Sequence, residues 1–249
     1  MDSKIKKSKL KIDKVRDETE SYRINKGILW DLPFSVLSVG KSYISGKSNL
    51  YVNTALKDEF NRNDFHGENM FVMSNSSKEP KTQLLISEKE IPKTNVFSKF
   101  NEDILEEIYN FIEERYYEAL EEKQKPPHFL IYLDDCSFGG NLKSNHYGTI
   151  PKIFQNGRHI NCSIWINAQK YSDILCSCRE NSTCLFLFSC SDKQLDLITE
   201  DHNFTNKKLF KKKFRQTTNE KHSFMCVNYS NDFKDRYLDS NFNIIDMSE

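Results

Sequence analysis

The sequence predicts an α/β fold in which a mostly parallel sheet is covered by helices on both faces. Apolar runs of strand length alternate along the chain with segments of helical period. The apolar runs are nearly continuous, which is typical of parallel strands that are buried on both sides. A chain of 249 residues is long enough to bury a sizeable core of this kind.

The expected elements follow from these patterns. We expect strands over residues 34–39, 70–73, 128–133, 161–167, 183–189 and 223–228. Helices are expected over 48–60 and 101–123, with one more after each of the strands 161–167 and 183–189. The 101–123 helix has the strongest pattern, because Ile104, Leu105, Ile108 and Ile112 recur at helical spacing. The prolines at 126 and 127 end it.

Charge and cysteine usage exclude some classes of protein. The 36 basic and 36 acidic residues balance, so no overall field favours nucleic acid. Basic residues gather locally, in residues 1–16 and 207–215. The seven cysteines lack metal-ligand spacing and several lie in apolar runs, which favours a reduced, intracellular setting. No segment is expected to span a membrane.

The most informative motif is a turn, Ser45-Gly46-Lys47-Ser48, which follows the first apolar run. Backbone N–H groups at the start of a helix cradle phosphates, a lysine reaches the terminal ones, and a hydroxyl holds Mg²⁺. The expected nucleotide-binding residues are Gly40, Ser45, Gly46, Lys47, Ser48 and Asn49. The loop has one residue more than the usual pattern, so bulky Tyr43 and Ile44 must point away from a nucleotide or crowd it.

Two further strand ends carry matching chemistry. The 128–133 strand ends in Asp134 and Asp135. Asp134 is expected to hold Mg²⁺ together with Ser48, and Asp135 to act as general base or to position the attacking water. Gln169 follows the 161–167 strand and is expected to sense the γ-phosphate. Ligands of parallel sheets bind at the carboxyl ends of the strands, so these groups predict one P-loop nucleotide site.

From Leu133 to Phe188 the chain resembles the FtsK–HerA superfamily of DNA-pumping ATPases, and within it the genome-packaging ATPases of large DNA viruses and virophages. The residues that carry the resemblance are Leu133-Asp134-Asp135, Asn156-Gly157-Arg158-His159, Ser163-Ile164-Trp165-Ile166-Asn167-Ala168-Gln169-Lys170-Tyr171, Cys178-Arg179-Glu180-Asn181 and Leu185-Phe186-Leu187-Phe188. With the phosphate loop, the similarity covers roughly residues 30–200. The loop is where this chain departs from the family, whose turn is usually tighter and richer in glycine.

The resemblance implies a RecA-like core that uses ATP and Mg²⁺ and assembles as a homo-oligomeric ring of five or six subunits around double-stranded DNA. It implies that an arginine acts on the neighbouring subunit's site, and Arg158 and Arg179 are the candidates. It also implies capsid vertex proteins as partners, and the virion or the viral factory in the host cytoplasm as the location. The expected divisions are a basic arm over 1–26, an ATPase domain over 27–230 and an acidic tail over 231–249.

Three other functions remain open on the sequence. A cellular or plasmid-borne translocase of the same superfamily would share every motif, but the chain carries no added membrane or DNA-reading segment. A non-hydrolysing interaction protein would explain the elongated loop, but Lys47, Asp134, Asp135 and Gln169 would then have no purpose. A small-molecule kinase would need a lid or an acceptor-binding segment, and none is apparent.

Overall fold

The computed structural model describes residues 24–134 and 145–248. Its strands are β1 (Ser35–Val39), β2 (Met70–Ser74), β3 (Val96–Phe97), β4 (Phe129–Asp134), β5 (Cys162–Ala168), β6 (Cys184–Phe188), β7 (Phe224–Asn228) and β8 (Tyr237–Leu238). Its α-helices are α1 (Lys47–Leu56), α2 (Pro80–Glu88), α3 (Glu102–Glu121), α5 (Thr149–Asn156), α6 (Cys176–Glu180), α7 (Asp192–His202) and α8 (Lys207–Thr217). Short 3₁₀ turns include η4 (Gly157–Ile160) and η5 (Tyr171–Asp173).

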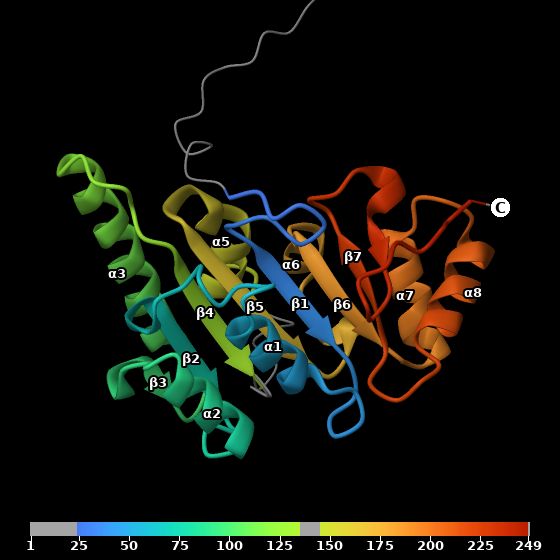
Figure 1. Cartoon of the computed structure of the whole chain (residues 1–249), viewed down its shortest axis with the longest axis horizontal. Helices are drawn as coiled ribbons and strands as arrows, with labels where there is room; N and C mark the ends of the chain where they lie inside the picture. Colours follow the sequence, from blue (N-terminus) through green and yellow to red (C-terminus); the bar gives the residue numbers. More distant parts are fainter. Residues whose placement is uncertain (1–23, 135–144, 249) are drawn as a thin grey trace, which may run out of the picture.

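The strands form one sheet in the order β3-β2-β4-β5-β1-β6-β7-β8. The strands from β3 to β6 run parallel, while β7 and β8 are antiparallel to their neighbours. The predicted α/β architecture is therefore confirmed. Figure 1 shows the parallel strands pointing toward the same edge of the sheet, where the 40–46 loop lies.

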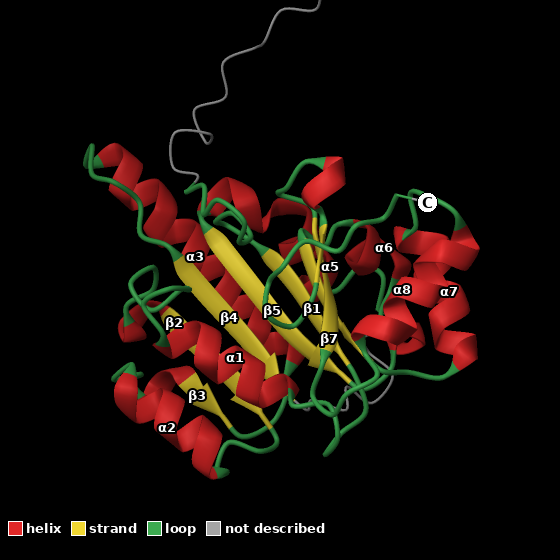
Figure 2. Ribbon diagram, turned by 45° about the vertical axis from the view of Figure 1, so that its right-hand side comes forward, coloured by secondary structure: helices red, strands yellow, loops and turns green. Residues whose placement is uncertain are grey.

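Helices cover both faces of the sheet (Figures 1 and 2). On one face, α1 and α2 pack with the segment before β1 around Trp30, Trp165 and Phe186. On the other face, α3, α5, α7 and α8 cover alternate side chains of the same strands. Both faces are thus sealed by apolar contacts, and this explains why the strand sequences are apolar almost throughout.

Local signals fix several helix boundaries. The Asn101 side chain accepts hydrogen bonds from the backbone N–H groups of Asp103 and Ile104 and thereby caps α3. Asn206 caps α8 in the same way. Helix α2 was not anticipated, although Pro80 at its first position is a common start signal. Helix α1 ends four residues earlier than expected, because Lys57 turns to an extended conformation.

The segment expected as an acidic tail adds the last strand to the sheet. Tyr237 and Leu238 of β8 pair with β7, and Leu238 also bridges to Ile244. Phe242 packs 5.2 Å from the ring of Phe60. Residues 237–245 are therefore part of the folded domain. Their apolar side chains pack this otherwise acidic segment against the rest of the domain.

Candidate nucleotide-binding site

The ends of three neighbouring strands bring several of the predicted site residues together. β4, β5 and β1 are adjacent and parallel, with Leu133 level with Ile166 and Val39 level with Ala168. The Gly40 N–H donates to the Ala168 carbonyl at 3.1 Å and so ties the start of the phosphate loop to the end of β5. The loop, Asp134 and Gln169 consequently lie along one edge of the sheet.

The phosphate loop is shaped by two glycines. Gly46 has φ 87°, a conformation that side chains rarely adopt, and it directly precedes α1. A Cβ at Gly40 would lie 2.7 Å from the Cβ atoms of Phe188 and Ser45, too close for any other residue. Tyr43 also has a positive φ of 70°, and its side chain and that of Ile44 are exposed to solvent. The two bulky residues therefore point outward.

The Lys47 side chain folds back into the loop. Its ammonium group donates to the Gly40 carbonyl at 2.5 Å and to Ser45 Oγ at 3.2 Å, and only 8% of the residue is exposed. A buried ammonium group needs acceptors around it. These two oxygens hold the lysine at the mouth of the loop, where it can exchange them for phosphate oxygens.

Ser48 and Asp134 meet as predicted. Ser48 Oγ donates to Asp134 Oδ2 at 3.0 Å, across from the first turn of α1 to the end of β4. Both groups offer oxygen atoms, the ligands that Mg²⁺ prefers, so this pair fits a magnesium site that is completed by water and phosphate. Asp135, the expected base, lies outside the described residues.

A series of buried polar side chains is hydrogen-bonded to the other oxygen of Asp134, and these bonds were not predicted from the sequence. The Asn167 amide donates to Asp134 Oδ1 and to the Tyr132 hydroxyl, each at 2.8 Å. Trp165 Nε1 in turn donates to the side-chain oxygen Oδ1 of Asn167 at 3.1 Å. Asn167 is 2% exposed. Asn167, a polar residue inside an apolar strand, was the sequence signal for such bonds, because a buried amide must be hydrogen-bonded.

Tyr132 also stacks on Tyr51 of α1, with ring centroids 3.4 Å apart. Burial raises the pKa of the Tyr132 hydroxyl well above its usual value, and the nearby Asp134 carboxylate raises that pKa further. Tyr132 is therefore a neutral phenol that can share hydrogen bonds with the carboxylate without competing for metal.

Gln169 is exposed just beyond β5 and lines a cavity of about 210 Å³. Gly40, Lys41 and Ser42 of the phosphate loop line the same cavity. The sensor candidate thus lies beside the loop, as its position after the central strand led us to expect. Its role as a sensor stays a prediction.

Neither arginine candidate is among the residues that line the cavities beside the phosphate loop. Arg158 belongs to η4, which precedes β5, and its side chain is exposed. The seven residues of β5 separate it from the site by roughly 20 Å. Arg179 of α6 is held within its own subunit by an ion pair of 3.0 Å with Asp201, and its guanidinium lies 4.8 Å from the centre of the Tyr171 ring. Of the two, Arg158 is the better placed to reach a neighbouring subunit.

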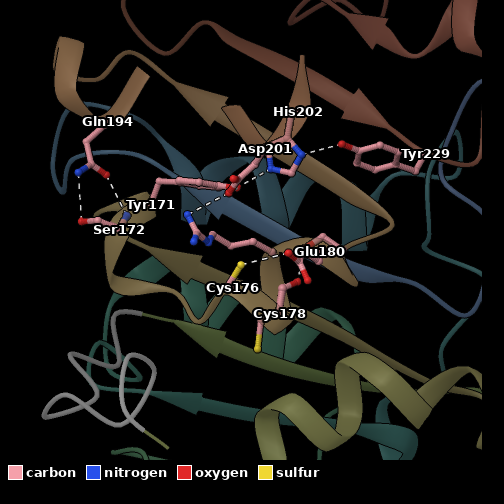
Figure 3. Close-up of polar contacts among 11 residues, drawn as sticks. Tyr171, Ser172, Cys176, Cys178, Glu180, Gln194, Asp201, His202 and Tyr229 are labelled. Carbon is pink, nitrogen blue, oxygen red and sulfur yellow. Dashed lines mark hydrogen bonds and ion pairs between the residues drawn. The ribbon is translucent and has the colours of Figure 1, made fainter. Parts of the chain in front are cut away.

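Figure 3 shows the polar network around Tyr171, Asp201, His202 and Tyr229. The Tyr171 hydroxyl donates to Asp201 at 2.7 Å and lies 2.6 Å from His202 Nε2, and His202 Nδ1 lies 2.6 Å from the Tyr229 hydroxyl. Since the Tyr171 proton goes to Asp201, His202 Nε2 carries the imidazole proton. Burial lowers the pKa of His202 to about 4. The network fixes the segment after Gln169 against α7 and β7.

The basic cluster of α8 is partly neutralised. Lys211 pairs with Asp196 at 2.5 Å and Arg215 with Asp192 at 2.8 Å, both on α7. Phe210 and Phe214 are buried in the core. The remaining cations that face solvent are Lys207, Lys208 and Lys212, with Lys213 partly exposed.

A phosphate loop, a Ser–Asp pair and a mostly parallel sheet define this protein as a P-loop NTPase. A family model described as "Poxvirus A32 protein" matches residues 24–236, and the chain belongs to that family. This confirms the resemblance to viral genome-packaging ATPases that the motifs indicated. No curated protein sequence matches the chain.

Several solved structures share the fold. The genome packaging NTPase B204 from Sulfolobus turreted icosahedral virus 2, in complex with AMP, matches with a TM-score of 0.55 and 15% identity over 83% of this chain and 95% of that one. The same protein in complex with ATP-gammaS matches with a TM-score of 0.53 and 15% identity, over 83% of this chain and 94% of that one. Its complex with sulfate matches with a TM-score of 0.54 and 16% identity, over 79% of this chain and 92% of that one. In the described part of this chain, no helix is both long and apolar enough to cross a bilayer.

Proposed function

We propose that this protein translocates double-stranded viral DNA into a preformed capsid, driven by Mg²⁺-dependent ATP hydrolysis at the interfaces of a homo-oligomeric ring. The observation that carries the proposal is the meeting of Lys47, Ser48 and Asp134 at one edge of the sheet. Membership of the Poxvirus A32 protein family and similarity to a genome packaging NTPase support it.

We assign a role to each residue of the site. The backbone N–H groups of the 45–48 turn, at the start of α1, receive the phosphates. Lys47 neutralises the terminal phosphates once it leaves Gly40 and Ser45. Ser48 and Asp134 hold Mg²⁺, which neutralises charge on the phosphate oxygens. Asp135 positions or deprotonates the attacking water, and Gln169 contacts the γ-phosphate.

The ring supplies what a single subunit lacks. Arg158 lies too far from its own site to act there, and its exposed side chain suits contact with the next subunit. An arginine supplied in this way stabilises charge on the phosphoryl group in transfer. Five or six subunits would enclose the duplex, and capsid vertex proteins would hold the ring during virion assembly.

DNA contacts are expected to be electrostatic and independent of sequence. Lys207, Lys208 and Lys212 of α8 are exposed cations that suit this role. Lys211 and Arg215 already pair with α7 and are less suited. The basic arm over residues 1–26 is a second candidate surface, and most of it lies outside the described residues.

The proposal is tested by phosphate release from purified protein with Mg²⁺-ATP, at low salt, with and without duplex DNA. We expect turnover that DNA stimulates and that Lys47→Ala reduces by about 100-fold or more, with an unchanged far-UV spectrum. Lys93→Ala, an exposed lysine on another part of the surface, serves as the control. Equal turnover in wild type and Lys47→Ala would refute the assignment.

The same assay tests the alternative function, a non-hydrolysing interaction protein. The positive φ of Tyr43 in the phosphate loop favours that alternative. That protein would bind nucleotide without releasing phosphate under either condition. DNA-stimulated turnover would exclude it.

A further inference from the structure

A groove runs along α1, and Asp134 is not among the residues that line it. Its volume is about 560 Å³, and it is lined by residues of α1, of the turn before β7 and of the segment after β8, together with Phe60, Lys81 and Phe188. The lining members used below are Gly46, Asn49, Asn53, His222, Phe224 and Phe242. Gly46 and Asn49 are also expected nucleotide-binding residues, whereas the other four have no role in the phosphate and metal chemistry described above.

The groove is continuous with the phosphate loop. It begins at Gly46, the residue that precedes α1. His222 lies against this glycine, since a Cβ on Gly46 would be 3.1 Å from His222 Nδ1. His222 also lines a smaller cavity of about 170 Å³ together with Lys41 and Ser45 of the loop. A ligand with phosphates in the loop would therefore meet His222 before it enters the groove.

His222 is held in an unusual backbone conformation. Its φ is 70°, in a region that non-glycine residues adopt uncommonly and at a cost. The side chain is exposed, so burial of the imidazole does not stabilise this conformation. The turn before β7 thus places an imidazole at the junction between the loop and the groove.

The groove offers the two kinds of contact that a nucleobase uses. Phe224 and Phe242, whose ring centroids are 5.9 Å apart, contribute aromatic surface together with Phe60 and Phe188. Asn49 and Asn53 lie one turn apart on α1 and present amides along one side. The Asn53 side chain donates to the Asn49 carbonyl at 2.8 Å. That bond uses one amide proton, so the second proton and the carbonyl oxygen can bind a base edge.

We propose that the groove binds the nucleoside part of the triphosphate, with the ribose near His222 and the base between Asn53 and the phenylalanine surface. This inference rests on the proposed function, because it takes Lys47 and the 45–48 turn as the phosphate site. It assigns the base to the groove along α1 and not to the 210 Å³ cavity, which lies between Gln169, the end of β6 and α7.

The first test compares ATP with inorganic tripolyphosphate, which has the phosphates but no nucleoside, by calorimetric titration in Mg²⁺. Asn53→Trp should fill the groove and weaken ATP binding by about tenfold or more, while tripolyphosphate binding changes less than about twofold. His222→Ala should act in the same direction with a smaller effect. Asn110→Trp, at an exposed position on α3, is the matched control.

Lys47→Ala distinguishes failure of this inference from failure of the proposed function. If the phosphate site is correct, Lys47→Ala weakens both ligands. Unchanged binding of both by Lys47→Ala, or no binding of either by wild type, would overturn the phosphate site and this inference with it. Unchanged ATP binding in Asn53→Trp, with Lys47→Ala defective, would overturn the groove alone. If wild type binds ATP but not tripolyphosphate, the ATP affinities of Asn53→Trp and Asn110→Trp decide.

A second measurement needs no variant. Wild-type protein is photolabelled with 8-azido-ATP and the labelled peptides are mapped by mass spectrometry, with excess ATP as competitor. Label within 49–60, 222–224 or 240–242 that ATP prevents supports the proposal. Label that is confined to 169–198 would instead place the base in the cavity beside Gln169 and overturn it.

Discussion

At the scale of single residues, the proposed site depends on a few side chains that make direct hydrogen bonds to one another. Asp134 receives hydrogen bonds from Ser48 on one oxygen and from Asn167 on the other. Ser48 bonds the oxygen that we propose faces Mg²⁺, whereas Asn167 is buried. In the proposed mechanism Asn167 is therefore a positioning residue, because it orients the carboxylate without contacting the ligand.

We predict that Asn167→Ala lowers turnover by about 10- to 100-fold and raises the Mg²⁺ concentration needed for half-maximal phosphate release. The physical reason is that Asp134 loses the donor that orients it. A merely structural role would lower the midpoint of thermal unfolding without shifting the Mg²⁺ dependence, and that result would contradict the prediction. Asn110→Ala, at an exposed position on α3, should leave both quantities unchanged.

A second prediction at this scale concerns Gly46. Gly46→Ala should lower the free energy of unfolding by about 1–2 kcal/mol for its positive φ alone, and further because its Cβ would meet His222. Gly27→Ala is the control, since Gly27 has φ 69° but no atom within 4 Å of a built Cβ. Urea unfolding should show the larger loss at Gly46, and adding His222→Ala should reduce it toward the Gly27 value. Equal losses of unfolding free energy in Gly46→Ala and Gly27→Ala would contradict the predicted clash with His222.

At the scale of elements, the sheet places the site and a buried network fixes what surrounds it. The Tyr171–Asp201–His202–Tyr229 network joins the segment after β5 to α7 and β7. His202 is 2% exposed, and burial, together with nearby Arg179, lowers its pKa, whereas Asp201 acts in the opposite direction. The native protein therefore keeps this imidazole neutral at pH values where an unfolded chain protonates it.

This yields a pH dependence of stability. The pKa of His202 is about 4 in the folded protein against 6.5 for the free group. The contribution of neutral His202 to the free energy of unfolding is complete above about pH 6.5. It is lost as the pH falls toward 4, because only the unfolded chain takes up the proton in that range. The loss amounts to about 2–3 kcal/mol.

Urea unfolding at pH 7.5 and pH 4.5 measures the effect. We expect His202→Gln to be less stable than wild type at pH 7.5 but to lose less stability on acidification. His66→Gln, at an exposed position, should retain the full pH dependence of wild type. Parallel loss in wild type and His202→Gln would show that this imidazole titrates normally.

At the scale of the whole molecule, the two edges of the sheet carry different parts of one proposed reaction. Lys47, Ser48 and Asp134 lie at the carboxyl edge, and Arg158 lies beyond the opposite end of β5. An arginine at that distance can only act on a second copy of the chain. Arg179 has no such freedom, because Asp201 and Tyr171 hold it.

The corresponding prediction uses mixed assemblies. Arg158→Ala and Lys47→Ala should each abolish most DNA-stimulated turnover alone. When the two are mixed, a Lys47→Ala subunit can offer its Arg158 to the intact phosphate site of an Arg158→Ala neighbour, so turnover should partly recover. Arg179→Ala should instead lower the unfolding temperature, because it leaves Asp201 without its cation. A mixture as inactive as its components would exclude Arg158 as the residue supplied between subunits.

Much of the fold and of the site was predictable from sequence, for physical reasons. Parallel strands buried on both faces must be apolar throughout, so five of the expected strands stand out as runs. The meeting of Lys47, Ser48 and Asp134 was predictable because the carboxyl ends of parallel strands share one edge of the sheet, while their roles with nucleotide and metal stay predictions. Asn167 and Tyr132 were missed, because their function depends on a cross-strand partner that adjacent residues do not reveal.

Local patterns in the sequence were enough to predict the class of fold and to indicate a phosphate site, since the first depends on apolar runs and the second on a glycine before a lysine. Three other findings required the folded arrangement of the chain. The tertiary structure showed that residues 237–245 belong to the sheet, that Arg179 is held by Asp201, and that His222 lies against Gly46. In each case the contact joins residues that are far apart in sequence, and its existence depends on how strands and helices pack rather than on any local preference.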